Sequence, residues 1–393
     1  MESVRQSPTD PDFVQSPYGF YRRLRAGGDF AFWEDYGLPV ATTFEAVSAV
    51  LKHRRLGRAV PEERRQPVAP GMEAFHAVEA HSMLETEPPE HTRLRRLVLK
   101  AFTTNRIQMM APGISQTADR LIDAFPAGPF DLLDAYARLL PVIVIARLLG
   151  VPEDKAPDLL AWSNAMVAMY QARRDAAIEA AAAKAAAAFS GYMREYVESR
   201  RGRPSDDLLS DLIAAEEAGD RLTTDEMIGT CILLLNAGHE ATVHTIGNAV
   251  RLLVDHRDRG DALAPEHIAG TVEECLRFDP PLHLFTRHVY EPVTIMDQSF
   301  APGDEIGCLL ASANRDDAVW PDGEKFDPFR APRQNVAFGA GIHFCVGAPL
   351  ARLELQIALP VLFARCPKLQ LTEEPWVANL YHFRGLERLT VTC

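Results

Sequence analysis

The chain reads F-G-A-G-I-H-F-C-V-G-A-P-L-A-R from Phe338 to Arg352, a glycine-rich loop that holds one cysteine. Its glycines at 339, 341 and 347 allow backbone conformations that other residues resist, so the loop can fold tightly. The apolar residues 348–359 predict a helix, which puts Cys345 just before a helix N-terminus. Free N–H groups and the helix dipole stabilise a thiolate there. An ionised sulfur in an apolar loop is costly unless it is coordinated, and a bound metal would remove that cost.

Three other interpretations of this loop must be weighed. Gly339 and Gly341 could belong to a dinucleotide-binding loop, but a third glycine and the strand–turn–helix context are missing. His343 and Cys345 could be half of a zinc site, yet no second pair lies nearby. A plain buried cysteine in a glycine-rich turn stays open on residue types alone.

The same stretch resembles the heme-binding loop of cytochrome P450 enzymes, F-x-x-G-x-[HR]-x-C-x-G. The match covers Phe338, Gly341, His343, Cys345 and Gly347, and the continuation to Arg352 is similar to bacterial members. The resemblance implies that Cys345 is the thiolate ligand to the iron of heme b (iron protoporphyrin IX), with Phe338, Gly339, His343 and Gly347 around the cofactor. It also implies a mainly α fold with minor β, a single large domain over residues 1–393 with a small β-rich lobe.

Composition narrows the partners and the location of the protein. The net charge of −13 over 393 residues argues against nucleic acid, because phosphate binding needs a basic surface. The N-terminus lacks a secretory pattern, and no run of about 18 apolar residues occurs, so we expect no membrane association. Six cysteines without paired spacing argue against a disulfide framework and favour a cytoplasmic location.

Hydrophobic spacing predicts mostly helices, the longest running from a capping box at Thr223 and Glu226 to about Asp255. We found no strand–helix alternation and no internal repeat, so the class is mainly α. The other predicted helices are 114–125, 141–149, 175–200 and 265–278, and the predicted strands are 30–33, 40–43, 289–296, 305–309 and 388–391.

The middle of the longest helix breaks local rules at one place. Gly238 weakens a helix by about 1 kcal/mol relative to alanine, and Glu240 is a poor choice for a buried segment. His239 and Glu240 could begin a zinc-protease motif, but the next histidine, His244, is at i+5 and faces elsewhere. Zinc is therefore rejected.

Ala237, Gly238 and Glu240 resemble the oxygen-activation segment of the P450 family. The resemblance implies that Gly238 lets the helix pass close over the porphyrin and that Glu240 relays protons from solvent. Relatives usually carry an alcohol directly after the acid, whereas this chain has Ala241 there and Thr242 one residue later, about 100° away. We hypothesise that an ordered water or a substrate hydroxyl supplies the missing hydrogen bond; an effect of Ala241→Thr confined to substrates lacking a hydroxyl would support this.

Glu274 and Arg277 lie three residues apart and are neighbours on one helix face. A surface ion pair is the default interpretation. The spacing is similar to the E-x-x-R motif of the family, which implies a buried pair that braces the cysteine loop. We expect Arg330 to complete this network, with Arg333 as the alternative.

The two heme propionates need cationic or hydrogen-bonding partners. His91 and Arg95 share a helix face, and bacterial family members use a matching pair. The resemblance adds Arg287 and His343 to this set. Each alone could equally be a solvated side chain.

Residues 91–118 form a basic run in an acidic protein, with Arg93, Arg95, Arg96, Lys100 and Arg106 and no acid. A solvated helix face is the plain interpretation. The alternative is a docking patch for an acidic ferredoxin, steered by charge.

The resemblance implies a monooxygenase that inserts one atom of dioxygen into a small, largely apolar organic substrate. Electrons would come from NAD(P)H through separate ferredoxin-type partners, because no flavin or iron–sulfur module is visible. A peroxide-driven peroxygenase and a non-catalytic heme-binding sensor or carrier are the alternatives. The predicted pocket lining comprises Leu234, Leu235, Leu284, Phe285 and residues 61–83 and 162–170.

Overall fold

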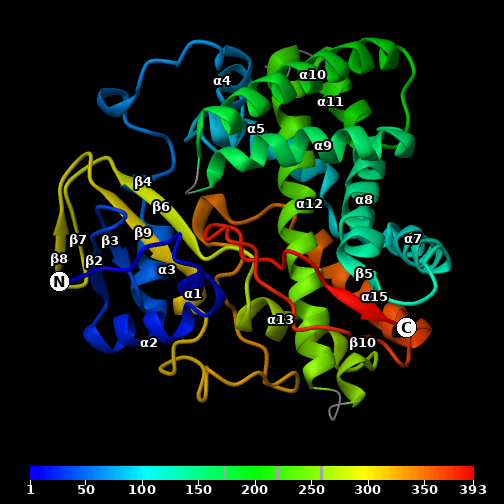
Figure 1. The fold of residues 1–393 in the computed structure, drawn as a ribbon. Coiled ribbons are helices and arrows are strands. Elements are labelled where there is room, and N and C mark those ends of the chain that lie inside the picture. Colours follow the sequence, from blue (N-terminus) through cyan, green and yellow to red (C-terminus); the bar gives the residue numbers. More distant parts are fainter. Residues whose placement is uncertain (172–173, 218–221, 257–259) are drawn as a thin grey trace.

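The fold is built around one long helix, and we describe it from a computed structural model covering residues 1–171, 174–217, 222–256 and 260–393. Helix α12 (Thr224–Asp255) begins at the predicted capping box, in which Thr223 and Glu226 satisfy each other's backbone N–H groups. Most of its residues are buried, so it passes through the core rather than along the surface. Figure 1 shows it standing in the middle of the helical part of the molecule.

The remaining helices surround α12, which contacts α4, α8, α9, α10, α13 and α15 among others. Those described are α1 (Pro11–Gln15), α2 (Tyr18–Gly27), α3 (Phe44–Lys52), α4 (Glu73–Glu79), α5 (Glu90–Ala101), α6 (Thr104–Met109), α7 (Ala111–Asp123), α8 (Leu139–Leu149), α9 (Ala156–Val167), α10 (Ala176–Arg200), α11 (Leu208–Glu217), α13 (Ile268–Phe278), α14 (Leu310–Ala313) and α15 (Ala348–Arg365). One-turn segments include the π-helix η2 (Leu133–Ala137) and the 3-10 helices η3 (Glu153–Lys155), η4 (Ala168–Tyr170) and η6 (Gly341–His343). Within the described ranges, no helix has the length and apolar character needed to cross a membrane.

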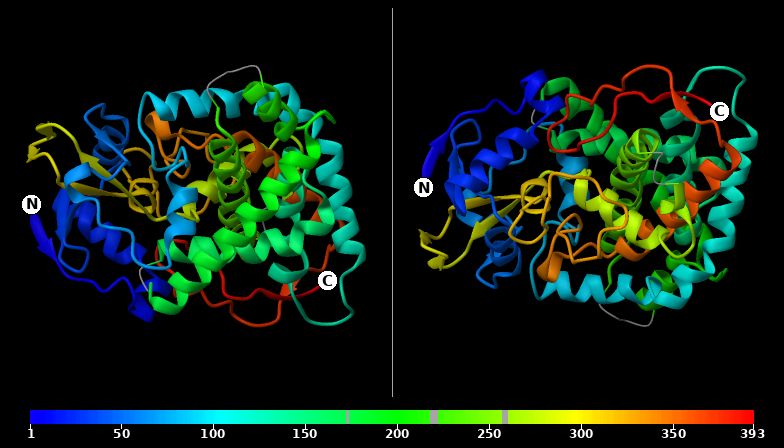
Figure 2. Two further views of the ribbon diagram at one scale, coloured as in Figure 1. Left: turned by 90° about the horizontal axis from the view of Figure 1, so that it is seen from above. Right: turned by 90° about the horizontal axis from the view of Figure 1, so that it is seen from below.

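Strands form small sheets at the ends of the molecule. The largest has the order β1-β2-β3-β9-β6-β4 and lies with α2 and α3 at the N-terminal end in each view (Figures 1 and 2). Its strands are β1 (Glu2–Val4), β2 (Phe30–Trp33), β3 (Leu38–Ala41), β4 (Leu56–Gly57), β6 (Leu284–Val289) and β9 (Glu305–Leu309). A hairpin joins β7 (Val293–Ile295) to β8 (Gln298–Phe300), and β10 (Gln370–Leu371), β11 (Thr390–Thr392) and β5 (Phe130–Asp131) form a third sheet.

The predicted class, mainly α with minor β, is confirmed, and most predicted elements are found, some with shifted ends. The single strand predicted over 289–296 is wrong: β6 ends at Val289, and β7 is a separate strand that pairs with β8 in another sheet. Helix α8 ends where Gly150 adopts a left-handed conformation, φ 78°. Helix α15 was expected to end before Pro360 but continues through it to Arg365. The expectation was wrong because a proline removes only one backbone donor, and packing of the buried Leu359 and Leu362 holds the helix on both sides.

Candidate functional site

The loop that carries Cys345 folds back tightly on itself and on α3. The Cys345 N–H donates to the Phe338 carbonyl at 3.1 Å, which closes the loop. Gly339 and Gly341 have φ of 69° and 76°, the left-handed region that favours glycine. A Cβ at Gly341 would lie 2.4 Å from the Leu51 carbonyl oxygen, so no other residue fits there.

Gly347 differs from the other loop glycines, and the expectation that it needs an unusual backbone is wrong. Its φ is −80°, an ordinary helical value, because it is the N-cap of α15. A Cβ there would meet the Cys345 sulfur at 3.8 Å, an ordinary contact distance. Gly347 instead lies directly against the sulfur.

Cys345 retains accessible surface, unlike four of the other cysteines. Dense protein surroundings nevertheless raise the pKa of its thiol, while the Gly347 and Ala348 N–H groups and the charges of Arg95 and Arg352 oppose that rise. The sulfur thus lies at the start of α15 with donors directed at it, as the sequence predicts. Arg95 also donates to the Phe344 carbonyl at 2.6 Å, which fixes α5 to this loop.

Small side chains form an accessible face in the middle of α12. Ala237 is exposed and Ala241 half-buried, although the helix otherwise passes through the core. The two residues are one turn apart on one face, and Leu234 precedes them on the same side. An accessible alanine inside a core helix indicates an internal opening that a large flat group could enter. Thr242, about 100° away from Ala241, is 5 % exposed and packs in the core.

Gly238 follows Ala237, lies three residues before Ala241 and is half-buried, and its place over the porphyrin stays a prediction. A Cβ at Gly238 would lie 2.8 Å from Cγ1 of Ile145 in α8. The glycine therefore allows α12 to approach α8 closely, and the alanines provide the open face.

Glu240 lies between two histidines of the same helix. Its carboxylate oxygens are 3.3 Å from His244 Nε2 and 3.5 Å from His239 Nε2. Burial would raise the pKa of Glu240, but His244, His239 and Arg138 together lower it below its ordinary value. The carboxylate is therefore ionised at neutral pH and 20 % exposed, so it is not sealed from solvent.

His91 and His343 are brought together although they are about 250 residues apart in sequence. Their ring centroids are 4.3 Å apart, and His343 Nε2 lies 3.0 Å from Glu87 Oε1. His91 is 2 % exposed, its Nδ1 has no hydrogen-bond partner among the described residues, and burial lowers its pKa to about 4. An unpartnered buried ring nitrogen indicates that a polar group is expected beside it.

Arg287 of β6 lies near this pair. It is 2 % exposed, burial lowers its pKa, and the charges of Arg58 and Glu87 act on it. Its guanidinium donates to the Thr286 carbonyl at 2.8 Å, and no carboxylate within the described ranges forms an ion pair with it. A buried guanidinium without an acid needs an anionic partner.

These features fit a heme. The thiol after the tight loop can serve as the iron ligand, and the face of alanines can lie against a flat macrocycle. The unpartnered imidazole nitrogen and the guanidinium that lacks an acid can bind the two propionates. Cys345 would hold the iron, Ala237 and Ala241 would face the ring, and His91, Arg95, Arg287 and His343 would lie toward the propionates. These assignments stay predictions of the residues' roles.

The Glu274–Arg277 pair is buried, not a surface pair. Both residues are at most 3 % exposed, and two parallel hydrogen bonds of 2.7 Å join them. Arg330 reaches Glu274 at 3.3 Å and completes the network, whereas Arg333 donates to the Val319 carbonyl. Arg277 also donates to the carbonyls of Asn314, Gly323 and Lys325, so it holds the segment that leads into the cysteine loop.

A second pair, which sequence reasoning missed, lies closer to the cysteine. Glu273 accepts from Arg352 of α15 and, at 3.2 Å, from Asn335 ahead of the loop. The Arg352 guanidinium lies 4.6 Å from the centroid of the Phe338 ring. The available signal was Arg352 itself, the last residue of the cysteine stretch.

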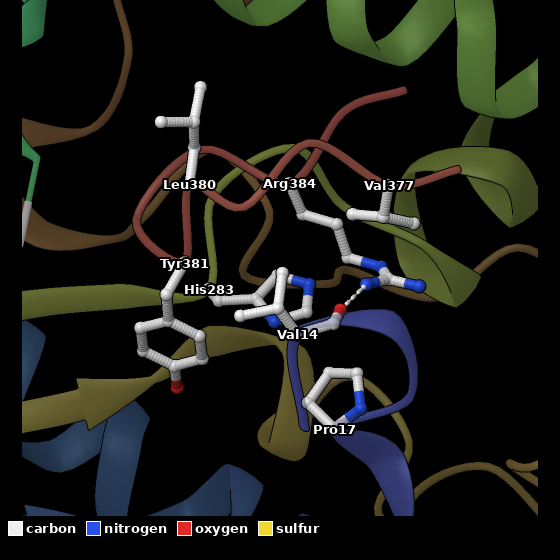
Figure 3. Close-up of a pocket in the computed structure, with 7 residues that line it drawn as sticks. All are labelled: Val14, Pro17, His283, Val377, Leu380, Tyr381 and Arg384. Carbon is white, nitrogen blue, oxygen red and sulfur yellow. Dashed lines mark hydrogen bonds between the residues drawn. The ribbon is translucent and has the colours of Figure 1, made fainter. Parts of the chain in front are cut away.

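Figure 3 shows a small pocket elsewhere, between α1 and the loop that leads to the C-terminus. Arg384 reaches across it to the Val14 carbonyl at 2.7 Å and binds Asp279 at 2.7 Å. Its lining of Val14, Pro17, His283, Val377, Leu380, Tyr381 and Arg384 includes none of the predicted heme contacts.

Comparison with known proteins gives one consistent result. The family model described as "Cytochrome P450" matches residues 40–269 and 266–374. Cytochrome P450 monooxygenase PikC of Streptomyces venezuelae is 38% identical over 97% of this chain and 92% of its own length. Vitamin D(3) 25-hydroxylase of Pseudonocardia autotrophica is 37% identical over 97% of this chain and 94% of its own length. The crystal structure of P450BioI in complex with hexadec-9Z-enoic acid ligated acyl carrier protein superposes with a TM-score of 0.91 at 32% identity, covering 98% of this chain and all of that one.

The chain therefore belongs to the cytochrome P450 family and has its fold. It is an oxidoreductase of the monooxygenase type that uses heme b and dioxygen, with NAD(P)H as the indirect source of electrons through redox partners.

Proposed function

We propose that the protein inserts one oxygen atom into a small, largely apolar organic substrate, with electrons delivered by a ferredoxin-type protein. The observation that carries the proposal is the pairing of an accessible thiol at the start of α15 with an accessible alanine face on α12. When bound at Cys345, heme supplies the activation of dioxygen. The protein's own residues hold the cofactor, shape the substrate side and keep a proton relay at Glu240.

The apolar substrate is supported by the side chains around that face. Leu234 precedes Ala237 by three residues and is buried, and Phe285 of β6 is half-buried beside the cysteine loop, 3.3 Å from where a Cβ of Gly339 would lie. One relative is named for vitamin D(3), and the P450BioI structure is a complex with hexadec-9Z-enoic acid ligated to acyl carrier protein; the vitamin and the fatty acid are both mostly hydrocarbon. A pocket of this kind takes its affinity from buried apolar area.

A screen of small organic compounds for a spin-state shift of the Soret band tests the proposal directly. Binders should then yield a hydroxylated or epoxidised product carrying one atom from labelled dioxygen. Cys345→Ala should abolish the red-shifted band of the reduced carbon monoxide complex, while Cys393→Ala, an accessible cysteine at the C-terminus, should keep it. Wild-type protein that retains no heme would overturn the proposal.

Ala241 keeps the peroxide-driven peroxygenase as a second candidate, because the alcohol of relatives is missing there. Glu240, ionised and flanked by histidines, favours the dioxygen route, since a peroxygenase needs no relay from solvent. Turnover with hydrogen peroxide compared with turnover on a ferredoxin and its reductase separates the two. A sensor or carrier would form no oxygenated product from any compound that it binds, even when reductant is supplied.

The proposed ferredoxin partner is supported by exposed basic side chains on α5. Arg93 pairs with Glu226, and Arg106 pairs with Asp206 at 3.0 Å and with Asp211, so these charges are compensated. Arg96 and Lys100 are exposed on the helix whose Arg95 contacts the cysteine loop. An acidic partner docking there would approach the cysteine side of the molecule.

Charge reversal tests the docking surface. The double variant Arg96→Glu with Lys100→Glu should slow reduction by an acidic ferredoxin and flatten its dependence on salt. Matched reversal at Lys184 and Arg194, both exposed on α10, should change neither. Equal rates and equal salt dependence in both doubles would remove this surface from the proposal. The proposal also includes a cytoplasmic location, because the cysteines lack paired spacing.

A further inference from the structure

The accessible face of α12 lacks a hydroxyl at the position after the acid, and neighbouring hydroxyls do not replace it. Ala241 presents a methyl group there. Thr245, one turn later, donates its hydroxyl to the Ala241 carbonyl at 2.7 Å, so that hydrogen is already used. Thr242 points about 100° away and is packed in the core.

His244 is a polar side chain less than one helical turn from this gap. It follows Ala241 by three residues and therefore lies on nearly the same face of the helix. Its Nε2 is 3.3 Å from Glu240 Oε1, and the side chain is 11 % exposed. The same nitrogen is buried and makes no hydrogen bond of good geometry with any described residue. It is thus close to the acid, and a small shift of either side chain would align the two.

The loop before the C-terminus holds the His244 ring in place. A Cβ at Gly385 would fall 1.7 Å from His244 Nδ1, so the backbone there lies directly against the ring. The Phe383 ring is 6.2 Å away, centroid to centroid. A ring packed in this way stays beside Glu240, while 11 % of the side chain remains accessible.

The other charged and titratable groups around the pair are few. Glu240 and His239 lie on α12, and Arg138 precedes α8 and pairs with Asp134. From the loop, His382 is buried with its pKa lowered to about 4, and Arg384 is held by Asp279. His244 is among the groups that lower the pKa of Glu240, whereas burial acts in the opposite direction.

Resting on the proposed function, we propose that His244 is the positioning residue that replaces the missing alcohol: it holds the Glu240 carboxylate beside the accessible face of α12 and reloads it with protons from the solvent side. The histidine loses its N–H proton to the carboxylate and regains one from water, so it is unchanged after each turnover. Overall, dioxygen, two protons and two electrons from the one-electron donor convert a C–H bond to C–OH and release one water. His244 acts on the proton supply only.

Two variants separate this role from plain packing. His244→Phe keeps the ring volume against Gly385 and removes both nitrogens, and His256→Phe removes a histidine at the end of α12 whose Nδ1 lies 2.8 Å from the Leu252 carbonyl, away from Glu240. In His244→Phe, the amount of product formed per NADPH should fall about tenfold or more, and the remaining electrons should appear as hydrogen peroxide. A tenfold fall is smaller than the full contribution of a positioned acid or base. His256→Phe should leave this ratio unchanged.

Restoring the alcohol is the decisive rescue. Ala241→Thr in the His244→Phe background should recover at least about half of the lost coupling, because the hydroxyl then does what the imidazole did. A residue that only fills space would not be rescued in this way.

The pKa of Glu240 provides a readout that needs no turnover. Carbon-13 NMR of the side-chain carboxyl, assigned by its loss in Glu240→Gln, should show this pKa rising in His244→Phe and unchanged in His256→Phe. Unaltered coupling in His244→Phe, an unaltered Glu240 pKa, or failure of Ala241→Thr to rescue would each overturn the proposal. Rescue by a substrate hydroxyl alone would also overturn it. A wild-type protein without a thiolate-type carbon monoxide band would instead overturn the proposed function and leave the NMR result standing.

Discussion

The cysteine loop and the middle of α12 face the same predicted cofactor but are built in opposite ways. The loop is held by side chains that come from distant parts of the chain, Arg277 and Arg352 among them, and by a glycine that no other residue could replace. The α12 face has small side chains, and its polar contacts are local, within four residues of Glu240. The side that holds the iron ligand is thus fixed by a long-range network, whereas the side that meets substrate is defined by the space its alanines leave.

Filling that space should give the largest effect. Ala237→Phe places a ring on the accessible face, so heme retention should fall more than tenfold while the helix content of the protein is unchanged, because no core contact is lost. Ala188→Phe, at an exposed alanine of α10, is the matched control and should keep full heme. The heme-to-protein absorbance ratio after purification measures both. Full heme in Ala237→Phe would show that this face is not where the cofactor lies.

Breaking the buried network should cost stability instead. Glu274→Ala leaves Arg277 buried without its acid, so the free energy of unfolding should fall by about 3–5 kcal/mol. Asp158→Ala, which removes an exposed pair with Lys155, should cost about 0–1 kcal/mol. Urea titrations followed by circular dichroism compare the two. A similarly small loss of unfolding free energy in both variants would mean that the buried Glu274 network does not hold the cysteine side.

Gly238 sharpens the contrast, because it is closely packed against α8. Gly238→Ala should destabilise the protein by about 1–3 kcal/mol, since the new Cβ meets Ile145. Gly191→Ala in α10 adds a Cβ with nothing within 4 Å and should stabilise by about 0.5–1 kcal/mol. Thermal and urea unfolding show whether each substitution raises or lowers the free energy of unfolding. A stabilising Gly238→Ala would contradict the packing seen here.

Glu354 is the exception on the cysteine side, and the effect of replacing it on stability should depend on pH. Burial raises the pKa of this α15 carboxyl well above its ordinary value, and one of its oxygens has no partner among the described residues. The folded protein therefore keeps the proton that the unfolded chain releases above its ordinary pKa, so stability falls as pH rises above about 4.5. Glu354→Gln should remove this slope, about 1.4 kcal/mol per pH unit at most. If the free energy of unfolding changed with pH equally in the wild-type protein and in Glu354→Gln between pH 5 and 8, this prediction would be wrong.

Much of the fold and the cysteine ligand could be predicted because local signals carry them. The capping box at Thr223 and the cysteine stretch at 338–352 each lie within one short segment. That one large domain spans the chain stays a prediction, which limited proteolysis can test.

Relations between distant segments could not be read from the sequence. The contact of Gly238 with Ile145 and the pairing of Glu273 with Arg352 depend on how helices pack, and no spacing rule encodes them. The i+4 relation of His244 to Glu240 is present in the sequence, but a zinc motif counted from His239 places His244 at i+5 and gives no sign of it.

The Arg384 bridge has a consequence for how the protein is made. Asp279 is buried and receives its guanidinium from a residue 105 positions later, and the same arginine caps the Val14 carbonyl near the start of the chain. The beginning of the polypeptide therefore gains this contact only after residue 384 has left the ribosome. In a shorter nascent chain Asp279 lacks the guanidinium and has only the Tyr18 hydroxyl and the charge of Arg315 to compensate it.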